Sequence, residues 1–301
     1  MTGAHPTRSA GHDPLVLSCL AATWLVWGST YLAIKFALVS LPPFFQMGTR
    51  FLVAGSLLLA WMRVARKAPW PSPRQWRNAL WIGTLLLGGG MGFTAYAEQS
   101  IESGLVVAFI GVGPILQAAF NSLWKIYPSR LEAAGIAVGM VGVLMLTQGA
   151  GFRGSPVGLV AMILATTTWA AGSVLSQRRF ELAPGAMGFA SEMLCGGIVL
   201  MAMSVAAGES STVVANWPYQ TEAVLAWLYL VVFGSLIAFN AYMVLLARAS
   251  AGVATSYTFV NPVIAMLLGI WLAGEVVTAY EWKAVAVILV GVMLLMARRW
   301  R

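Results

Sequence analysis

Residues 14–38 read PLVLSCLAATWLVWGSTYLAIKFAL, a continuous apolar stretch in which Lys35 is the only charged residue. A helix needs about 20 predominantly apolar residues to cross the hydrocarbon core of a bilayer. The stretch is longer than the apolar core of a cleaved signal peptide, and no small-residue cleavage site follows it. It therefore predicts an uncleaved first transmembrane helix, preceded by a polar cytoplasmic tail over residues 1–13.

The composition of the whole chain agrees with this interpretation. Hydrophobic residues make up 59% of its 301 residues, charged residues only 9%, and the mean hydropathy is +0.81. Soluble globular domains carry about 25% charged residues, so this chain has too little polar surface for a soluble enzyme or binding module. The same numbers exclude a disordered chain or a coiled coil. The sequence predicts an all-α polytopic membrane protein without a sizeable extramembrane domain.

Nine further apolar stretches follow the first, separated by short connections. Prolines stand at many of their ends, where they interrupt a helix at little cost. The longest connection on the outer side is the loop over 207–221. The ten predicted transmembrane helices cover 14–38, 42–63, 76–98, 101–124, 130–149, 155–178, 184–206, 222–247, 252–274 and 279–298.

Lysine and arginine residues are distributed unevenly between the two sides of this arrangement. With the N-terminus inside, 14 of the 18 lie in inner connections and tails; Lys35, Arg153 and Lys283 lie outside, and Arg50 lies within the second helix. Because positive residues concentrate on the cytoplasmic side, both termini are predicted to be cytoplasmic. The net charge of +8 is then explained by these loops and by anionic lipid, so we expect no nucleic-acid partner.

The two halves of the chain resemble each other. Trp27-Gly28-Ser29 matches Ala171-Gly172-Ser173 at an offset of 144, GLVVAFIGVGP at 104–114 matches GVATSYTFVNP at 252–262 at 148, and Gly142-Val143 matches Gly291-Val292 at 149. Five predicted helices per copy is an odd number, so the second copy would enter the membrane from the opposite side, as in many secondary transporters. We expect two inverted five-helix repeats over 14–149 and 155–298, followed by a basic cytoplasmic end at 299–301.

Several short motifs resemble the drug/metabolite transporter superfamily, in its EamA-type branch. They are Trp27-Gly28-Ser29 with Lys35-Phe36, Arg50-Phe51, Pro114, Asn261-Pro262 and Gly274-Glu275, and the similarity covers essentially the whole chain. It implies a ten-span exporter of small metabolites in a bacterial inner membrane, most similar to exporters of aromatic amino acids. The family often has a second Gly-Glu pair after the fourth span. Here that region reads Lys125-Ile126-Tyr127, so a symmetric acidic pair is not implied.

Charged side chains within membrane helices are costly and indicate function. Arg50 would face a cavity and attract a substrate carboxylate, or else bind helix-end carbonyls. Lys35 would guide an anion, or extend to the interface. Glu192 would bind a substrate ammonium or take up a proton, or else pair with a polar neighbour. By depth, Arg50 and Glu192 are not expected to pair directly.

Prolines and aromatic residues complete the predicted binding site. Pro114 and Pro262 interrupt two helices at matched positions, which points to a central site. Asn261 adds an amide that can donate and accept. Aromatic residues within the helices suit a polar cavity, although each could simply pack in the core or face lipid. The full set of predicted substrate-binding residues is Trp24, Trp27, Tyr31, Lys35, Arg50, Tyr96, Pro114, Trp169, Glu192, Tyr242, Tyr257, Asn261 and Pro262.

These features favour an alternating-access exporter of amphipathic solutes, above all bulky apolar amino acids. The alternative is an exporter of cationic drugs with the same fold. A membrane-embedded enzyme would need a nucleophile with a base, or a metal cluster, and both histidines lie in the tail. No cofactor or metal site and no ATP-binding motif is predicted, and proton coupling at Glu192 stays open. The small-residue face at Gly135–Gly142 would pack within its own repeat or form a dimer, which leaves the oligomeric state open.

Overall fold

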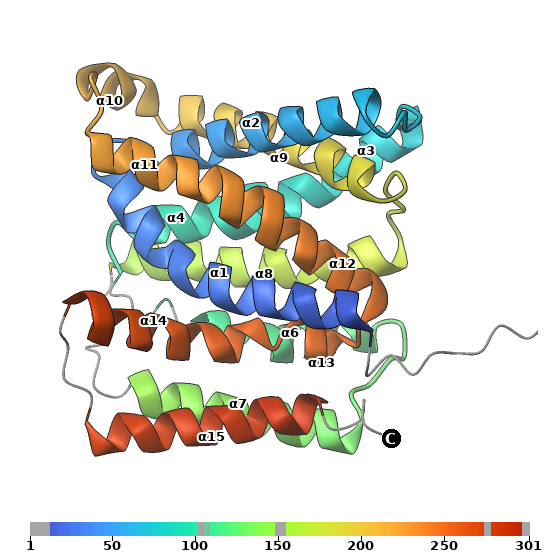
Figure 1. Cartoon of the computed structure of the whole chain (residues 1–301), viewed down its shortest axis with the longest axis vertical. Coiled ribbons are helices and arrows are strands. Elements are labelled where there is room, and N and C mark those ends of the chain that lie inside the picture. The colour runs from blue at the N-terminus through green and yellow to red at the C-terminus, as the bar shows by residue number, and fades with distance from the viewer. Residues whose placement is uncertain (1–12, 102–105, 107–108, 148–154, 274–277, 297–301) are drawn as a thin grey trace, which may run out of the picture.

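A computed structural model of the protein describes residues 13–101, 106, 109–147, 155–273 and 278–296. These residues form a bundle of helices that run across the view of Figure 1, roughly parallel or antiparallel to one another. Six helical segments in the described part are long and apolar enough to cross a membrane. The six segments cover residues 14–38, 43–64, 73–97, 156–178, 186–206 and 221–248. They lie at six of the ten stretches predicted from hydropathy, and shorter helices lie at the other four stretches.

Prolines and capping side chains determine where several helices begin. Proline occupies the first turn of helices α1, α2, α3, α6 and α8, where its missing N–H breaks no hydrogen bond. The side chains of Asp13, Ser72 and Ser155 accept hydrogen bonds from the first turns of α1, α3 and α8. The bounds are α1 Pro14–Leu38, α2 Pro43–Val64, α3 Pro73–Gly83, α4 Phe93–Ala97, α6 Gly113–Ser122, α7 Arg130–Thr147, α8 Pro156–Arg178, α9 Ala186–Ala206, α10 Glu209–Ala215, α11 Thr221–Tyr229, α12 Asn240–Arg248, α13 Ala251–Ala254, α14 Tyr257–Ala273 and α15 Ala279–Met296.

Two of these helical segments contain π-helical stretches at matched places. The segment η2 (Thr84–Gly92) joins α3 to α4, and η3 (Leu230–Phe239) joins α11 to α12. Their first residues are separated by an offset of 146, which agrees with the offsets of the sequence repeat. A π-helix is rare and is concentrated at functional sites. Gly88, Gly89 and Gly90 lie within η2.

Two pairs of antiparallel helices join the first half of the chain to the second. Helix α2 packs along α9, and α7 packs along α15 (Figure 1). A β-carbon at Gly291 of α15 would lie 2.5 Å from the backbone nitrogen of Gly139 in α7, so the two backbones approach as closely as glycine allows. The small-residue face at Gly135–Gly142 therefore packs on α15 of the other half, and not within its own half.

Two other sequence predictions are wrong in detail. Pro262 does not interrupt its helix, because α14 runs through it and the break comes earlier, between α13 and α14. A proline removes only one backbone hydrogen bond, which a packed membrane helix tolerates. The connection at 207–221 is not only a loop: it contains α10, whose Glu209 accepts hydrogen bonds from the backbone N–H groups of Phe44 (3.1 Å) and Phe45 (2.8 Å) at the start of α2.

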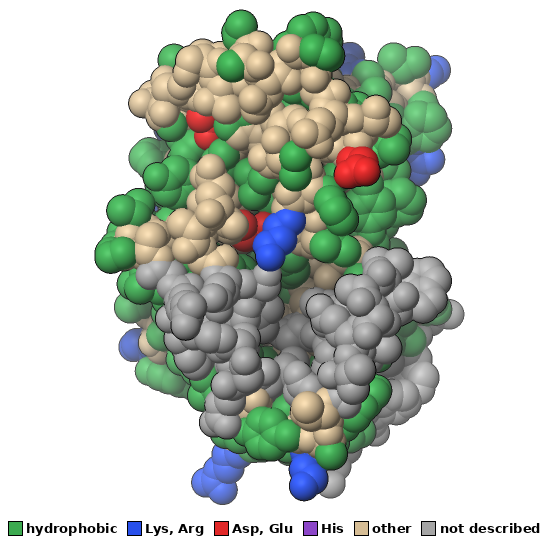
Figure 2. Space-filling view, turned by 90° about the vertical axis from the view of Figure 1, so that its left-hand side faces the viewer, with side chains coloured by type: hydrophobic (Ala, Val, Ile, Leu, Met, Phe, Trp, Pro, Cys, Tyr) green, Lys and Arg blue, Asp and Glu red, His purple; other side chains and the backbone are tan. Residues whose placement is uncertain are grey.

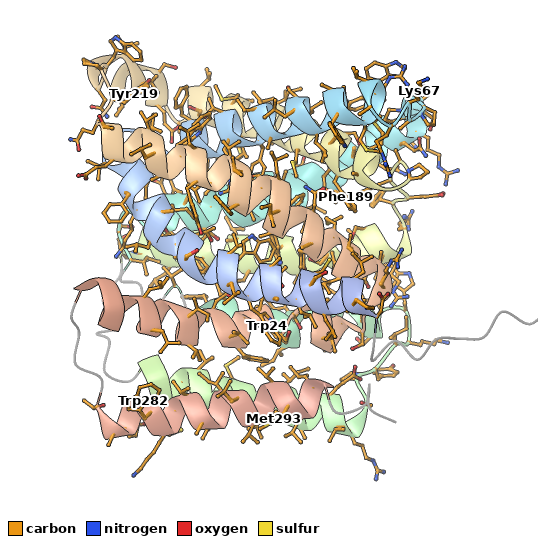
Figure 3. All side chains as sticks on the ribbon, viewed as in Figure 1. Trp24, Lys67, Phe189, Tyr219, Trp282 and Met293 are labelled. Atoms are coloured by element: carbon orange, nitrogen blue, oxygen red, sulfur yellow. The ribbon has the colours of Figure 1, made fainter. Side chains whose placement is uncertain are left out.

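The surface of the described part fits an apolar surrounding. Large hydrophobic side chains are exposed along the helices; Trp61, Trp81 and Met293 are at least half exposed. Figure 2, which views one end of the bundle, shows hydrophobic side chains along its flanks and few charged ones among the described residues. Lys67 and Tyr219 lie at opposite ends of the bundle (Figure 3). Helix α1 begins and α15 ends at the same end as Lys67.

Candidate functional site

A central cavity of about 90 Å³ lies among α1, α2, η2, α4, α6, α8 and the start of α14. Four aromatic rings line it: Trp27, Tyr31, Trp169 and Tyr257. Five threonines and one amide supply polar groups: Thr30, Thr94, Thr166, Thr255, Thr258 and Gln117. Arg50 is the one charged side chain in its described lining. Such a mixture of aromatic walls with few polar groups is typical of a small-molecule site.

Arg50 is held in the cavity wall with few partners for its charge. The side chain is 2% exposed; its Nε donates to Oγ of Ser235 at 2.6 Å and its Nη1 to the sulfur of Met47 at 3.5 Å. The guanidinium carbon lies 4.8 Å from the centre of the Phe51 ring. No carboxylate of the described residues pairs with it. A buried cation is stable only when its charge is compensated, so this arrangement favours a bound anion.

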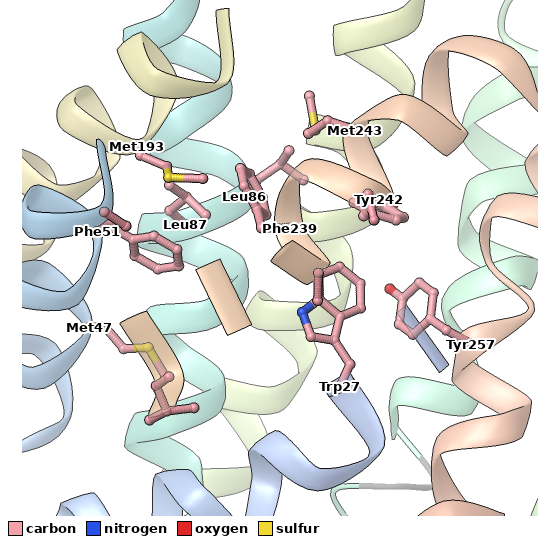
Figure 4. Packing of buried hydrophobic residues seen from close by; sticks show 14 of the residues in the cluster. Trp27, Met47, Phe51, Leu86, Leu87, Met193, Phe239, Tyr242, Met243 and Tyr257 are labelled. Carbon is pink, nitrogen blue, oxygen red and sulfur yellow. The ribbon is translucent and has the colours of Figure 1, made fainter. Parts of the chain in front are cut away.

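Four aromatic rings meet beside the cavity. The ring centre of Trp27 lies 4.7 Å from that of Tyr257, 5.1 Å from Tyr242 and 5.7 Å from Trp169. Figure 4 shows Tyr242 and Tyr257 next to Trp27, on the same side of its ring. The offset and edge-to-face arrangements stabilise the cluster and leave the rings as an apolar, polarisable wall. Nε1 of Trp27 donates to the carbonyl of Gly234 at 3.4 Å, whereas Nε1 of Trp169 is buried without a partner in the described part of the chain.

A second, larger hollow lies beside Tyr242. This cleft, of about 1180 Å³, lies between α1, α8, α9 and α12. Phe189, labelled in Figure 3, lines it together with Ala241 and Met243, the two neighbours of Tyr242. The ring of Tyr242 itself is fully buried against Trp27 and Trp169, which line the cavity. Tyr242 therefore contacts two rings of the cavity wall, while its two neighbours in the chain line the cleft.

Of the predicted site residues, five line the cavity: Trp27, Tyr31, Arg50, Trp169 and Tyr257. Tyr242 lies directly behind them. Trp24 and Asn261 instead join α1 to the start of α14. Nε1 of Trp24 donates to Oγ of Ser256 at 3.0 Å. With the amide of Asn261 in the orientation that its surroundings require, its nitrogen donates to the carbonyls of Trp24 (3.2 Å) and Tyr257 (3.0 Å).

The remaining predicted residues lie away from the cavity lining. Tyr96 stacks on Phe44 with ring centres 5.5 Å apart, Lys35 is exposed in the last turn of α1, and Pro114 is buried in the first turn of α6. The side chain of Pro262 lies outside the described residues.

Glu192 is placed elsewhere, in the contact of α9 with α2 and α3. It is fully buried, and neither carboxylate oxygen has a hydrogen-bond partner among the described residues. A β-carbon at Gly83 of α3 would touch its carbonyl oxygen, which shows how closely α3 approaches. Glu192 therefore does not join Arg50 in one binding site, and its side chain is suited to a neutral, protonated form.

Several polar residues of the site escaped the sequence analysis. Gln117 and the five threonines line the cavity. The available signal was their position: each is a polar residue within or beside an apolar stretch. Among the described residues no three His, Cys, Asp or Glu side chains gather as a metal site.

Comparison with known proteins shows the family to which this chain belongs. The model of the EamA-like transporter family matches residues 15–148 and again 156–297. The uncharacterized inner membrane transporter YedA of Escherichia coli is 41% identical over 280 residues, which cover 93% of this chain and 90% of that protein. The uncharacterized transporter sll0355 of Synechocystis is 26% identical, with 93% and 89% covered. A crystal structure of a protein that shares 21% identity superposes with a TM-score of 0.75 over 95% of this chain and 99% of that one, which shows the common fold.

Proposed function

Since this chain belongs to the EamA-like transporter family, we propose that it is an inner-membrane exporter of small amphipathic metabolites, above all aromatic and other bulky apolar amino acids. The observation that carries the substrate class is Arg50, a buried cation that lines a cavity among aromatic rings and has no described carboxylate partner. The guanidinium would bind the substrate carboxylate, and the rings of Trp27, Trp169 and Tyr257 would contact its apolar side chain.

The proposed architecture is ten transmembrane helices in two inverted halves over 14–149 and 155–298, with both termini in the cytoplasm. The pairing of α2 with α9 and of α7 with α15 supports it, because each pair joins corresponding helices of the two halves. The matched π-helical segments η2 and η3 support it too. In such a protein the two halves rock around a central site. The solute would enter by the cleft beside Tyr242 and leave from the cavity on the other side.

Proton coupling is proposed at Glu192. A carboxyl group buried without a partner is far more stable neutral than charged, so a change in its protonation would favour a different packing of α9 against α2 and α3. Since Glu192 lies apart from the cavity lining, the proton and the solute would occupy separate sites.

The second candidate function is export of cationic drugs by the same fold. The aromatic rings of the cavity would bind a cation through their faces. Arg50 argues against it, because a permanent cation in this cavity would be repelled and no described lining residue carries a negative charge.

Counterflow in proteoliposomes tests the proposal. Vesicles that contain the purified protein are loaded with unlabelled phenylalanine, and entry of labelled phenylalanine is followed with and without a pH gradient. We expect saturable exchange that tryptophan and leucine inhibit and tetraphenylphosphonium does not. Absence of exchange by protein that elutes as one folded species, or exchange of tetraphenylphosphonium in its place, would overturn the amino acid assignment.

A further inference from the structure

A chain of hydrogen bonds behind the cavity connects α6, α12 and α8. Nε2 of Gln117 donates to Oη of Tyr242 at 3.2 Å, Oη of Tyr242 lies 2.7 Å from Oγ of Ser173, and Oγ of Ser173 donates to the carbonyl of Trp169 at 2.7 Å. Gln117, Tyr242 and Ser173 are each at most 1% exposed. None of these bonds involves Arg50, which would bind the substrate carboxylate.

The direction of this chain is fixed by its last member. A backbone carbonyl can only accept, so the single hydroxyl hydrogen of Ser173 goes to Trp169. Ser173 then accepts the hydrogen of Tyr242, which leaves the lone pairs of the Tyr242 oxygen free to accept. The NH₂ group of Gln117 donates to that oxygen. The chain thereby holds the amide in one orientation, with its carbonyl oxygen turned away from Tyr242.

That carbonyl oxygen is left without a partner. Oε1 of Gln117 is buried and makes no hydrogen bond to the described residues, while Gln117 itself lines the cavity. A buried acceptor without a partner is costly, and a ligand that supplies an N–H would relieve that cost. The cavity thus carries two complementary polar groups: Arg50 offers only donors, and the fixed Gln117 carbonyl offers only an acceptor.

We propose that Gln117 Oε1 accepts a hydrogen bond from the ammonium group of the substrate, with Tyr242 and Ser173 as positioning residues, so that the site selects α-amino acids over carboxylic acids that lack the amino group. This inference rests on the proposed function and names the second recognition element of the same site. An amide dipole binds an ammonium more weakly than a carboxylate would, and the faces of Trp27, Trp169 and Tyr257 add to it. A moderate affinity suits a transporter, which must also release its substrate.

Three competitors in the counterflow assay test this assignment: phenylalanine, 3-phenylpropanoate, which lacks the amino group, and phenethylamine, which lacks the carboxylate. For the unaltered protein we expect 3-phenylpropanoate to be about 10- to 100-fold weaker than phenylalanine, as the loss of one hydrogen bond to a charged group predicts. In Gln117→Leu, the potency of phenylalanine as a competitor should fall to that of 3-phenylpropanoate, whereas the potency of 3-phenylpropanoate should stay the same. That retained potency shows that the variant is folded.

Three further variants sharpen the test. Tyr242→Phe removes the hydroxyl that orients the amide. The potency of phenylalanine relative to that of 3-phenylpropanoate should therefore fall, without loss of 3-phenylpropanoate binding. Gln117→Glu should strengthen the binding of phenethylamine and weaken that of 3-phenylpropanoate, because a carboxylate attracts an ammonium group and repels another carboxylate. The matched control is Gln99→Leu, at an exposed glutamine outside the cavity lining, which should change nothing.

The outcomes separate this inference from the proposed function. Exchange of phenylalanine with equal competition by 3-phenylpropanoate in the unaltered protein, or an unchanged ratio in both Gln117 variants, overturns the role of Gln117 and leaves amino acid export intact. If phenylalanine is not exchanged and none of the three compounds competes, the proposed function is overturned, and the inference with it.

Discussion

A β-carbon at position 234 would lie 2.6 Å from Nη2 of Arg50, so the guanidinium of α2 occupies the space that Gly234 of η3 leaves open. The adjacent residue Ser235 accepts the Nε–H of the same arginine. The π-helical segment of one half of the chain therefore holds the charged group of the other half in the cavity wall. The position of the Arg50 guanidinium thus depends on both halves of the chain.

Replacement of Gly234 by alanine should displace the Arg50 side chain, because the added methyl group meets the end of a flexible side chain and not the backbone. We expect the protein to fold and its half-saturation concentration for phenylalanine to rise about tenfold, through a weakened charge-assisted hydrogen bond. The control is Gly113→Ala, also in the cavity lining, where the nearest atom to a new β-carbon is 3.7 Å away. Equal effects of the two variants would contradict this role of Gly234.

Arg50→Gln tests the carboxylate site directly. Loss of the guanidinium should weaken the binding of phenylalanine and of 3-phenylpropanoate by about 10- to 100-fold in counterflow, whereas the binding of phenethylamine should not weaken. Arg50→Lys should recover part of the affinity, because it retains the charge without the planar fork of donors. If Arg50→Gln leaves phenylalanine exchange unchanged, or improves transport of permanent cations, the cationic-drug alternative gains over the amino acid assignment.

Glu192→Gln should separate coupling from exchange. An imposed pH gradient is expected to drive accumulation of phenylalanine in vesicles with the unaltered protein, and this accumulation should disappear in the variant. Exchange without a gradient should persist, since Glu192 lies apart from the cavity lining. A response to the pH gradient that survives in Glu192→Gln would exclude this carboxyl as the proton carrier, and no response in either protein would make the protein a facilitator.

Gly291→Val should destabilise the pair formed by α7 and α15. The new side chain would meet the backbone of Gly139, which cannot move without separating the helices. We expect a loss of about 1–3 kcal/mol in the free energy of unfolding, as for other overpacked sites, visible as a lower thermal midpoint in detergent. Gly113→Ala again serves as the control. An unchanged midpoint for Gly291→Val would show that the two helices are not in this close contact in the membrane.

Cysteine labelling in intact cells tests the orientation. In a chain with Cys19 and Cys195 replaced by alanine, Ser211→Cys in α10 should react with a membrane-impermeant maleimide added outside, and Arg66→Cys, between α2 and α3, should react only after permeabilisation. Both positions are exposed. The reverse pattern would place the termini outside, against the orientation that the basic loops predict.

Local features of the sequence were sufficient for the helices and for part of the site. The bounds of α1, 14–38, agree with the predicted stretch, because the partition of an apolar segment into the membrane depends on its own composition. Arg50 could be predicted as a site residue because a charge in an apolar helix needs a reason that the helix itself does not supply. Gln117 gave a weaker signal of the same kind, since a neutral amide is less costly to bury.

The partners of these residues could not be predicted in the same way. Whether Gln117 meets Tyr242, whether Gly234 faces Arg50, and whether Gly139 meets Gly291 depend on the rotation and crossing of helices that are distant in the chain. The π-helical turns of η2 and η3 shift those rotations, and apolar helices without a clear polar face do not reveal them. The sequence alone thus determined the membrane-spanning character of the chain and singled out Arg50, the charged residue of the cavity wall, because both follow from the transfer of single segments from water to lipid. The tertiary packing alone set the orientation of the Gln117 amide and the location of Glu192 outside the cavity, because both are properties of contacts among three helices at once.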